Sequence, residues 1–328
     1  MWFEDLTGLD SDRPAHVRAN VTLDGQFLTS QGNNRRMQAG ILTTPALAEL
    51  RAATPAPVPG GKIKARQIIA DAQALHRDPA NAGASFQAAS QFNLLEMVSP
   101  NVSPEAGIAR YEYDHTQGPA CAIACGAGTL YRNYLVPLNG QTGQSDSNQI
   151  DCLADLGAAL GNSENQLWQM QNGYALPIEA GLAQVTETLN AASAAALDRL
   201  AGLLRVGVQS DTEVTITPGG HLVTQIYASA LPMRYSHLRD ETFEPFARLV
   251  LNAAYEATLR AALIASAKSG NQHLYLTLLG GGAFGNRTEW IVDAIERALT
   301  LLSDHDLDVY IVSYSRPSPE IDAMIARL

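Results

Sequence analysis

Two hydrophobic periods alternate along this chain. Short apolar runs typical of buried strands are followed by stretches in which apolar residues recur at the spacing of an amphipathic helix. The succession is clearest near the C-terminal end, where a strand from Leu274 leads into a glycine-rich loop, a helix over Thr288–Ala298 and a strand over Leu307–Tyr314. Strands that alternate with helices predict an α/β fold with a mixed central sheet and helices on both faces.

The rest of the chain follows the same two periods. A stretch rich in proline and glycine, Ala53–Gly61, predicts a linker. We therefore expect an N-terminal extension over residues 1–60, packed on a main domain over residues 61–328 that carries a helical insertion at about 139–203. The expected strands are Ala15–Leu23, Gln26–Ser30, Ser85–Asn93, Thr129–Pro137, Gln166–Leu176, Glu213–Thr217 and His221–Ala228. The expected helices are Ile63–His76, Pro104–Tyr113, Pro119–Ala127, Gln149–Leu160, Pro177–Leu203 and Glu244–Ala267.

Composition and charge narrow the class of protein. With 46% hydrophobic and 17% charged residues, a chain of 328 residues can bury a sizeable core. The net charge of −11 argues against a protein that follows a nucleic-acid backbone, which needs clustered Lys and Arg. The chain opens with acidic residues and holds no long apolar run, so no signal peptide or membrane span is expected and the predicted location is cytoplasmic. Its three cysteines are too few for a disulfide framework.

The glycine-rich loop after Leu276 indicates a site for phosphate. Residues without a Cβ let backbone N–H groups approach an oxyanion, and the N-terminus of the helix that follows adds partial positive charge. Gly280, Gly282 and Gly285 also satisfy the dinucleotide-binding pattern G-x-G-x-x-G. That pattern normally opens its domain, whereas little chain remains here, so a nicotinamide-dinucleotide oxidoreductase is a secondary alternative.

A second stretch rich in chemically active side chains runs from Phe86 to Tyr134. Cys121 follows Gln117-Gly118-Pro119 in a way that superficially resembles the start of papain-type cysteine hydrolases, but the spacing from Gln117 differs from theirs. Cys121 and Cys125 are expected to be small buried residues on one face of a helix. Paired ligands at short spacing occur only once, and the histidines are scattered, so no metal site is expected.

Three segments together resemble the macrodomain family. They are Phe86–Asn93 ending a strand, Val223–Pro232 ending near a proline, and Leu276–Asn286 leading into the glycine loop. The resemblance covers roughly Ala84 to Ser315 and is nearest to the poly(ADP-ribose) glycohydrolase-like and ADP-ribosyl-arginine hydrolase branches. The usual signature Asn-Ala-Ala-Asn followed by three glycines is absent after Asn93.

This resemblance implies a macrodomain-like fold that binds ADP-ribose. It assigns the distal ribose to Asn93, the pyrophosphate to the glycine loop, and the adenine to the ring of Tyr314. It implies no cofactor, and ADP-ribose and ADP-ribosylated protein as partners. The implied ligand-binding residues are Asn93, Gly118, Gly280, Gly281, Gly282, Ala283, Phe284, Gly285, Asn286 and Tyr314.

The expected activity is hydrolysis of the bond at the anomeric carbon of ADP-ribose attached to protein. Such a reaction needs a carboxyl group that protonates the leaving atom or orients water. Asp114 is the first candidate, Glu96 the second, and Gln117 a residue that orients them. A non-catalytic reader of ADP-ribose, with the same pocket and no working carboxylate, is the principal alternative.

Overall fold

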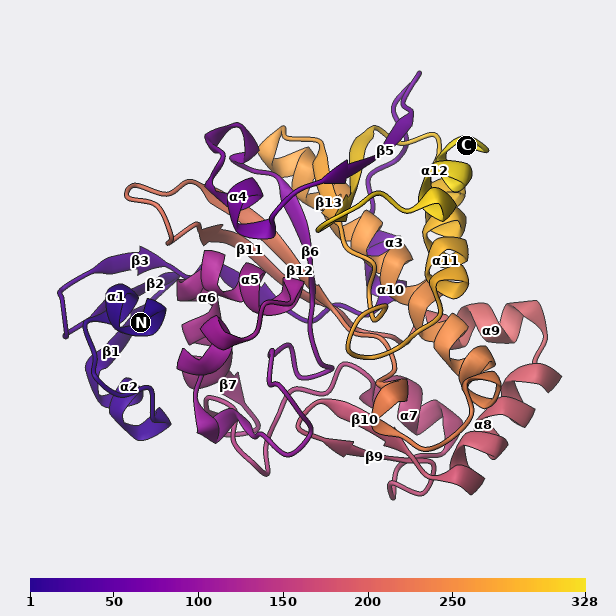
Figure 1. Cartoon of the computed structure of the whole chain (residues 1–328), viewed down its shortest axis with the longest axis horizontal. Coiled ribbons are helices and arrows are strands. Elements are labelled where there is room, and N and C mark those ends of the chain that lie inside the picture. The colour runs from indigo at the N-terminus through magenta and orange to yellow at the C-terminus, as the bar shows by residue number, and fades with distance from the viewer.

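The computed structural model describes residues 1–328 and centres on a seven-stranded mixed sheet (Figure 1). The strand order is β4-β11-β12-β6-β13-β14-β5. The five strands from β12 to β5 are parallel to one another, and β4 and β11 are antiparallel to their neighbours. The predicted mixed α/β class is therefore confirmed. The strands are β4 (Ile41–Thr43), β5 (Ile63–Ile69), β6 (Ser85–Ala89), β11 (Gly207–Glu213), β12 (Leu222–Ala228), β13 (His273–Leu276) and β14 (Leu307–Ser313).

Helices cover both faces of this sheet (Figure 1). The long helix α10 packs on β12, β6 and β13, and its own outer sides hold α3, α8, α9 and α11. On the opposite face α5 packs on β6, α6 packs on β11, and α4 packs on α5. The helices are α3 (Leu47–Ala53), α4 (Ala72–Arg77), α5 (Gln117–Ala124), α6 (Gly126–Leu130), α8 (Glu179–Ala191), α9 (Ala194–Ala201), α10 (Asp240–Ser269), α11 (Thr288–Leu301) and α12 (Pro319–Ile325).

The predicted C-terminal succession is confirmed. β13, α11 and β14 follow one another as expected, and the helix buries its predicted stripe from Trp290 to Ala298. Side chains of β13 alternate between the two faces, as those of any strand do. Tyr275 stacks between Phe86 and Tyr310 on one face, while Leu274 and Leu276 join the main core on the other.

The N-terminal residues form a small unit beside the sheet. Two helices precede a three-stranded antiparallel sheet, and their apolar side chains share a core with α5 and α6. β4 then enters the central sheet beside β11, so the sheet itself contains residues from before the predicted boundary at residue 60. These elements are α1 (Trp2–Thr7), α2 (Pro14–Asn20), β1 (Val21–Asp24), β2 (Phe27–Ser30) and β3 (Arg36–Gln38).

Residues 139–203 lie outside the central sheet. The predicted strand at Gln166–Leu176 is a hairpin that turns at Asn172-Gly173, both with positive φ. The predicted long helix is two helices, because Ser193 caps a new one through a hydrogen bond from the N–H of Ala196. Just before this region lies β7 (Pro137–Leu138), and within it the further elements are β8 (Gln141–Thr142), α7 (Ala154–Leu160), β9 (Trp168–Gln171) and β10 (Tyr174–Pro177).

Several predicted elements are wrong. The strand expected at Glu213–Thr217 is a turn, because β11 ends at Glu213, and the helix expected at Pro104–Tyr113 is two short 3-10 turns. Ile63–Ile69 has residues of high helix propensity, yet it forms the edge strand β5, because pairing along its whole length with β14 outweighs propensity. The predicted strand Ala15–Leu23 is helical up to Asn20. Thr129–Pro137, rich in β-favouring residues, continues α6 into a π-helical turn, Tyr131–Leu135. That wider turn lets Arg132, Asn133 and Tyr134 be buried side by side.

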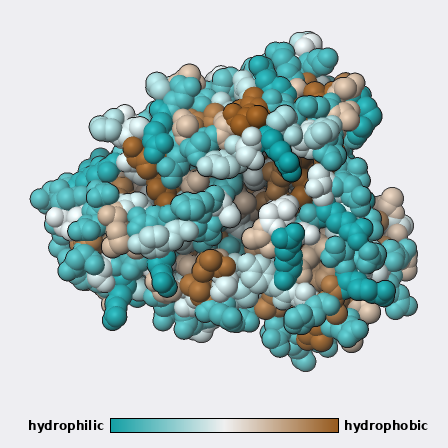
Figure 2. All heavy atoms as spheres, in the orientation of Figure 1, coloured by the Kyte–Doolittle hydropathy of each residue, from teal (hydrophilic) through white to brown (hydrophobic).

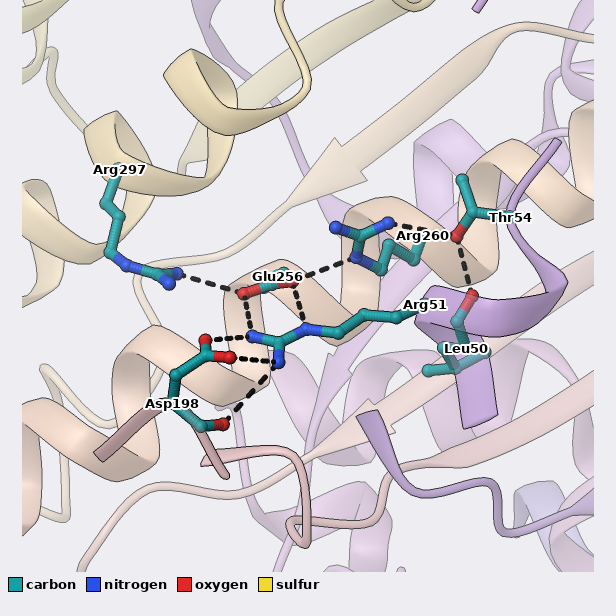
Figure 3. Close-up of polar contacts among 7 residues, drawn as sticks. All are labelled: Leu50, Arg51, Thr54, Asp198, Glu256, Arg260 and Arg297. Carbon is teal, nitrogen blue, oxygen red and sulfur yellow. Dashed lines mark hydrogen bonds and ion pairs between the residues drawn. The ribbon is translucent and has the colours of Figure 1, made fainter. Parts of the chain in front are cut away.

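A buried ion network joins four helices on the α10 side of the sheet (Figure 3). Glu256 of α10 has a side chain only 1% exposed and pairs with Arg51, Arg260 and Arg297 at 2.7, 2.9 and 3.1 Å. Burial alone would raise the pKa of Glu256, but the hydrogen bonds from these guanidinium groups outweigh it and lower the pKa to about 2. Glu256 is therefore a structural charge, and the network closes at Asp198, which pairs with Arg51 at 2.8 Å.

The surface agrees with the acidic, polar composition. The face seen in Figure 2 is mostly hydrophilic, with small and separate hydrophobic patches. None of the helices combines the length and the apolar character that a membrane crossing requires.

Candidate functional site

A crevice opens where the neighbouring strands β6 and β13 separate. Their register pairs only Leu274 with Ser85 and Tyr275 with Phe86. Beyond this point the side chain of Gln87 accepts the N–H of Thr277 at 3.2 Å. Ligands of open α/β sheets bind at the carboxyl ends of such strands. The carboxyl end of β6 therefore faces a space that β13 no longer fills.

Gln117 closes one side of this gap. Its amide accepts the N–H of Ala89 at 2.9 Å and donates to the carbonyl of Gln87 at 2.7 Å, so it pairs with β6 as a neighbouring strand would. The same amide also donates to the sulfur of Cys121 at 3.1 Å. Because both ends of the amide are engaged, Gln117 anchors the start of α5 to β6. With both its oxygen and its nitrogen engaged, the Gln117 side chain has no free polar atom with which to orient a catalytic carboxyl group.

The crevice contains a cavity of about 250 Å³. Its walls are the end of β6, the loop that carries Glu96, the start of α5, the glycine loop after β13, and three aromatic side chains. The structure thus brings together most of the predicted site. Predicted residues that line the cavity are Glu96, Asp114, Gln117, Gly118, Gly280, Gly282, Ala283 and Phe284.

The glycine loop presents unpaired backbone donors to this cavity. The N–H groups of Gly280, Gly282, Ala283 and Phe284 make no hydrogen bond within the protein, and all four residues line the cavity. The loop keeps its shape through other amides, including that of Asn286, which donates to the carbonyl of Gly280 at 2.9 Å. Helix α11 follows two residues later. Unpaired donors at a helix N-terminus attract anions.

Two glycines in this loop have backbone conformations that favour glycine. Gly280 has φ of 75° and Gly285 has φ of 77°. A Cβ atom at Gly285 would overlap the side chain of Arg234. Arg234 lies directly on the loop, donates its backbone N–H to the carbonyl of Phe284 at 3.1 Å, and has no carboxylate partner. An exposed and unpaired cation therefore accompanies the unpaired amides.

Glu96 is a buried carboxyl group in the wall of the cavity. The residue is 4% exposed, and its Oε1 atom has no hydrogen-bond partner. Burial is the main cause that raises the pKa of Glu96 well above its usual range, and Asp114 raises it further, while Arg132 acts in the opposite direction. A carboxyl group whose pKa is raised in this way keeps its proton to a higher pH than an ordinary carboxyl group, as a proton donor requires.

Asp114 lines the same cavity from a more open position. It is half-buried, and its Oδ1 atom accepts the N–H of Thr116 at 2.9 Å, which orders the turn into α5. The buried Glu96, whose pKa is raised, suits the donation of a proton better than Asp114, which is more exposed to solvent. Of the two predicted candidates, Glu96 therefore has the environment better suited to a general acid.

Three aromatic side chains form one wall of the cavity. The ring of Tyr174 lies 5.0 Å from that of Tyr235 and 5.3 Å from that of Phe284. Tyr174 is held by a hydrogen bond of 2.6 Å from its hydroxyl to the carbonyl of Met97, in the loop that carries Glu96. Flat rings placed this way can pack on a sugar or a base.

Several predicted contact residues do not line the cavity. Asn93 is fully buried, four residues beyond the end of β6, and its amide binds Gln149 and the N–H of Leu95. Tyr314 is 77% exposed. Gly281, Gly285 and Asn286 shape the glycine loop through their own hydrogen bonds. The amide of Asn93 is thus held within the protein, and neither Asn93 nor Tyr314 is among the residues that line the cavity.

Sequence reasoning missed Arg132, Arg234, Tyr174 and Tyr235. Each comes from an element far along the chain from Glu96, and only tertiary folding places it at the site. One signal was available for Arg132, a lone charge among Leu130, Tyr131, Tyr134 and Leu135. Charges flanked by apolar residues on both sides are rarely buried without a reason.

The three cysteines are unreactive groups, of which Cys121 contacts Gln117 at the edge of the site. Cys121, Cys125 and Cys152 are buried and unpaired, and burial raises the pKa of each thiol. Since the thiolate is the nucleophilic form, these residues are unsuited to covalent catalysis. Histidine, cysteine and acidic side chains do not gather anywhere in groups of three or more that could hold a metal ion.

Comparison with known sequences finds no matching family model and no matching curated protein. Comparison with solved structures does find similar folds. Poly(ADP-ribose) glycohydrolase from Thermomonospora curvata matches with a TM-score of 0.45 at 13% identity, over 96% of each chain. The enzyme from Deinococcus radiodurans, in complex with ADP-ribose, matches with a TM-score of 0.38 at 14% identity, over 87% of this chain and 92% of that chain. Both alignments cover most of this chain at low sequence identity.

Proposed function

We propose that this protein is an ADP-ribosyl hydrolase, which binds ADP-ribose and removes it from modified protein side chains by cleaving the glycosidic bond. One observation carries the proposal. A buried carboxyl group with a raised pKa, Glu96, shares a cavity with four unpaired backbone amides that precede a helix. The buried carboxyl group can act as a general acid, and the unpaired amides can bind a pyrophosphate.

The charges around the cavity favour an anionic ligand at the glycine loop. The protein as a whole carries a net charge of −11 and repels anions, so local donors must attract them. Arg234 and the N–H groups of Gly282 and Ala283 are such donors. The aromatic wall from Tyr174 to Phe284 can pack against a ribose or base of the same ligand.

The chemistry follows from the protonated state of Glu96. As the bond between the anomeric carbon and the leaving atom breaks, the Glu96 carboxyl group gives its proton to that atom. Water then adds its oxygen to the anomeric carbon, and the ionised Glu96 takes up the proton that this water releases. The protein ends the cycle unchanged, and the products are ADP-ribose and the free side chain.

Asp114 has a supporting role in this proposal. Its carboxylate lines the cavity, and the Coulombic effect between the two groups raises the pKa of Glu96. Removing its charge should therefore make Glu96 easier to ionise and reduce turnover to a smaller extent. Such pairs of carboxyl groups in different environments are typical of glycosidic-bond hydrolysis.

The test combines ligand binding with product release. Calorimetric titration with ADP-ribose should show binding in the wild type and in Glu96→Gln, since the substitution keeps size and removes the proton donor. Release of ADP-ribose from an ADP-ribosylated protein should fall roughly 10²- to 10⁴-fold in Glu96→Gln and less in Asp114→Asn.

The outcomes separate the two readings of the site. Binding without release by the wild type would show a reader of ADP-ribose, the alternative without catalysis. Absence of binding would reject both. Glu105→Gln, at an exposed position outside the cavity, is the control and should leave binding and release unchanged.

A further inference from the structure

Arg132 is a completely buried arginine with no carboxylate within ion-pair distance. Such a charge is costly to bury without compensation. Its guanidinium lies over the ring of Tyr227, with 3.7 Å between Cζ and the ring centroid. Its Nη1 group has no hydrogen-bond partner. A residue of this kind calls for an explanation beyond packing.

One hydrogen bond of the Arg132 side chain leads to the loop that carries Glu96. Its Nε group donates to the carbonyl of Leu94 at 3.1 Å. Leu94 has φ of 65°, a left-handed conformation that is strained for a bulky side chain. The side-chain amide of Gln144 donates both to the carbonyl of Asn93 and to that of Arg132, at 3.0 and 3.1 Å. The Arg132 side chain therefore holds this loop directly at Leu94, its strained residue, and Gln144 links the backbone of Arg132 to the neighbouring Asn93.

The π-helical turn explains how the side chain reaches this place. Within Tyr131–Leu135 the widened turn directs consecutive side chains into the core. Nη2 of Arg132 donates to the hydroxyl of Thr129 at 3.1 Å, one turn earlier. Turns of this type occur often at functional sites.

We propose that Arg132 is a positioning residue of the site: its guanidinium fixes the loop that carries Glu96 and supplies the buried positive charge against which the Glu96 carboxyl group releases and regains its proton. The role in turnover rests on the proposed function, whereas the effect on Glu96 itself does not.

Both neutral and charged side chains surround Glu96. Tyr111, Cys121, Tyr174 and Tyr227 face the buried cluster as neutral groups whose pKa values burial raises. Asp114 approaches from the loop before α5, and its charge raises the pKa of Glu96. Arg132 is the one cation that lowers the pKa of Glu96. Without Arg132, the pKa of the Glu96 carboxyl group would rise further, and the group would give up its proton to the leaving atom less readily.

The first experiment follows the titration of Glu96 by the ¹³C signal of its carboxyl carbon, assigned by its loss in Glu96→Gln. In Arg132→Met the midpoint should rise by about one pH unit or more, because the positive charge is gone. Arg248→Met, which removes an arginine paired with Glu244 and Asp293 outside the cavity, should leave the midpoint unchanged. An unchanged midpoint in folded Arg132→Met would overturn the proposal.

A second measurement covers the case in which Arg132→Met fails to fold. Arg132→Lys keeps the charge but loses the hydrogen bond from Nε to the carbonyl of Leu94. The N–H groups of Leu95 and Met97, bonded within the loop, should then exchange with solvent at least roughly tenfold faster, while those of β14 keep their rates. Unchanged exchange in the loop would overturn the positioning role. Neither measurement depends on turnover, so a wild type without hydrolase activity would reject the proposed function and leave this inference standing.

Discussion

The carboxyl group of Glu96 occupies the space into which a side chain on Gly118 would project. A Cβ atom on Gly118 would overlap Oε2 of Glu96 and the carbonyl oxygen of Ala89. Gly118 is the second residue of α5, so the helix can approach the end of β6 and the buried acid only because this position lacks a side chain. The helix start, the strand end and the acid thus depend on one glycine.

Gly118→Ala should therefore damage both stability and the site. Neither the backbone carbonyl of Ala89 nor the buried carboxyl group can move away freely, so we expect a loss of about 1 to 3 kcal/mol in the free energy of unfolding. Release of ADP-ribose should fall as well, since Glu96 is displaced. Urea unfolding monitored by circular dichroism measures the first effect, and the release assay measures the second.

Gly282→Ala is the matched control for stability. A Cβ atom at Gly282 would meet nothing within 4 Å, and its φ is not positive. Its free energy of unfolding should stay within about 0.5 kcal/mol of the wild-type value. Equal losses in the two variants would contradict the proposed close approach at Gly118.

Arg234→Ala should weaken binding of ADP-ribose. The guanidinium lies on Gly285 without a carboxylate partner, and we expect its removal to cost roughly three- to tenfold in affinity, in the range of an exposed charged contact. The wild type should also lose more affinity than the variant when salt is raised, because the lost interaction is screened. Calorimetric titration at low and high salt measures both effects.

Arg239→Ala provides the comparison for this experiment. Arg239 is exposed and lies in the same connection before α10, but unlike Arg234 it is not packed against Gly285 of the glycine loop. Its removal changes the net charge by the same amount. If both variants lost affinity equally, the effect would come from overall charge, and a specific contribution of Arg234 at the glycine loop would be rejected.

His76 should make stability depend on pH. It is fully buried, its Nδ1 lies 2.7 Å from the carbonyl of Ala72, and its Nε2 lies 3.0 Å from the amide nitrogen of Gln225. Because an amide nitrogen only donates, Nε2 must accept and the ring must be neutral. Burial is the main cause that lowers the pKa of His76 from 6.5 to about 4.

The sign of the effect follows from linkage. Between pH 6.5 and about 4 the unfolded chain binds the proton and the folded protein does not, so stability is full above pH 6.5 and falls as pH decreases through this window. The loss amounts to roughly 3 kcal/mol. Urea unfolding at several pH values should show this slope in the wild type and a smaller one in His76→Gln. Equal slopes would contradict a buried neutral His76.

The parts of the fold that the sequence predicts well are those with local causes. The run of glycines predicts the loop, and the unbroken hydrophobic periods predict α11 and β14, all of which the structure contains. The edge strand β5 was missed because its residues favour a helix locally, and only the partner strand β14 decides otherwise.

The candidate site was predictable to the same extent. Glu96 and Asp114 share a cavity with the glycine loop, as the resemblance implied. Which acid is buried was not predictable, because the desolvation of Glu96 comes from elements distant in the chain. The inward turn of Asn93 likewise depends on Gln149, which lies in the insertion. Tertiary contacts of this kind leave no local pattern.

Glu256 provides a prediction away from the cavity. Three arginines surround its carboxylate, which is 1% exposed (Figure 3). Glu256→Gln keeps the shape but leaves these arginines without their common anion, so the free energy of unfolding should fall by about 3 to 5 kcal/mol. Glu289→Gln, which removes an exposed carboxylate 3.8 Å from Arg287, should cost no more than about 1 kcal/mol. Because the pKa of Glu256 is lowered to about 2, its contribution should persist above pH 4.5 and disappear as pH falls toward 2. Thermal unfolding of both variants at neutral pH measures the difference, and a Glu256→Gln variant as stable as Glu289→Gln would show that solvent already neutralises the arginine cluster.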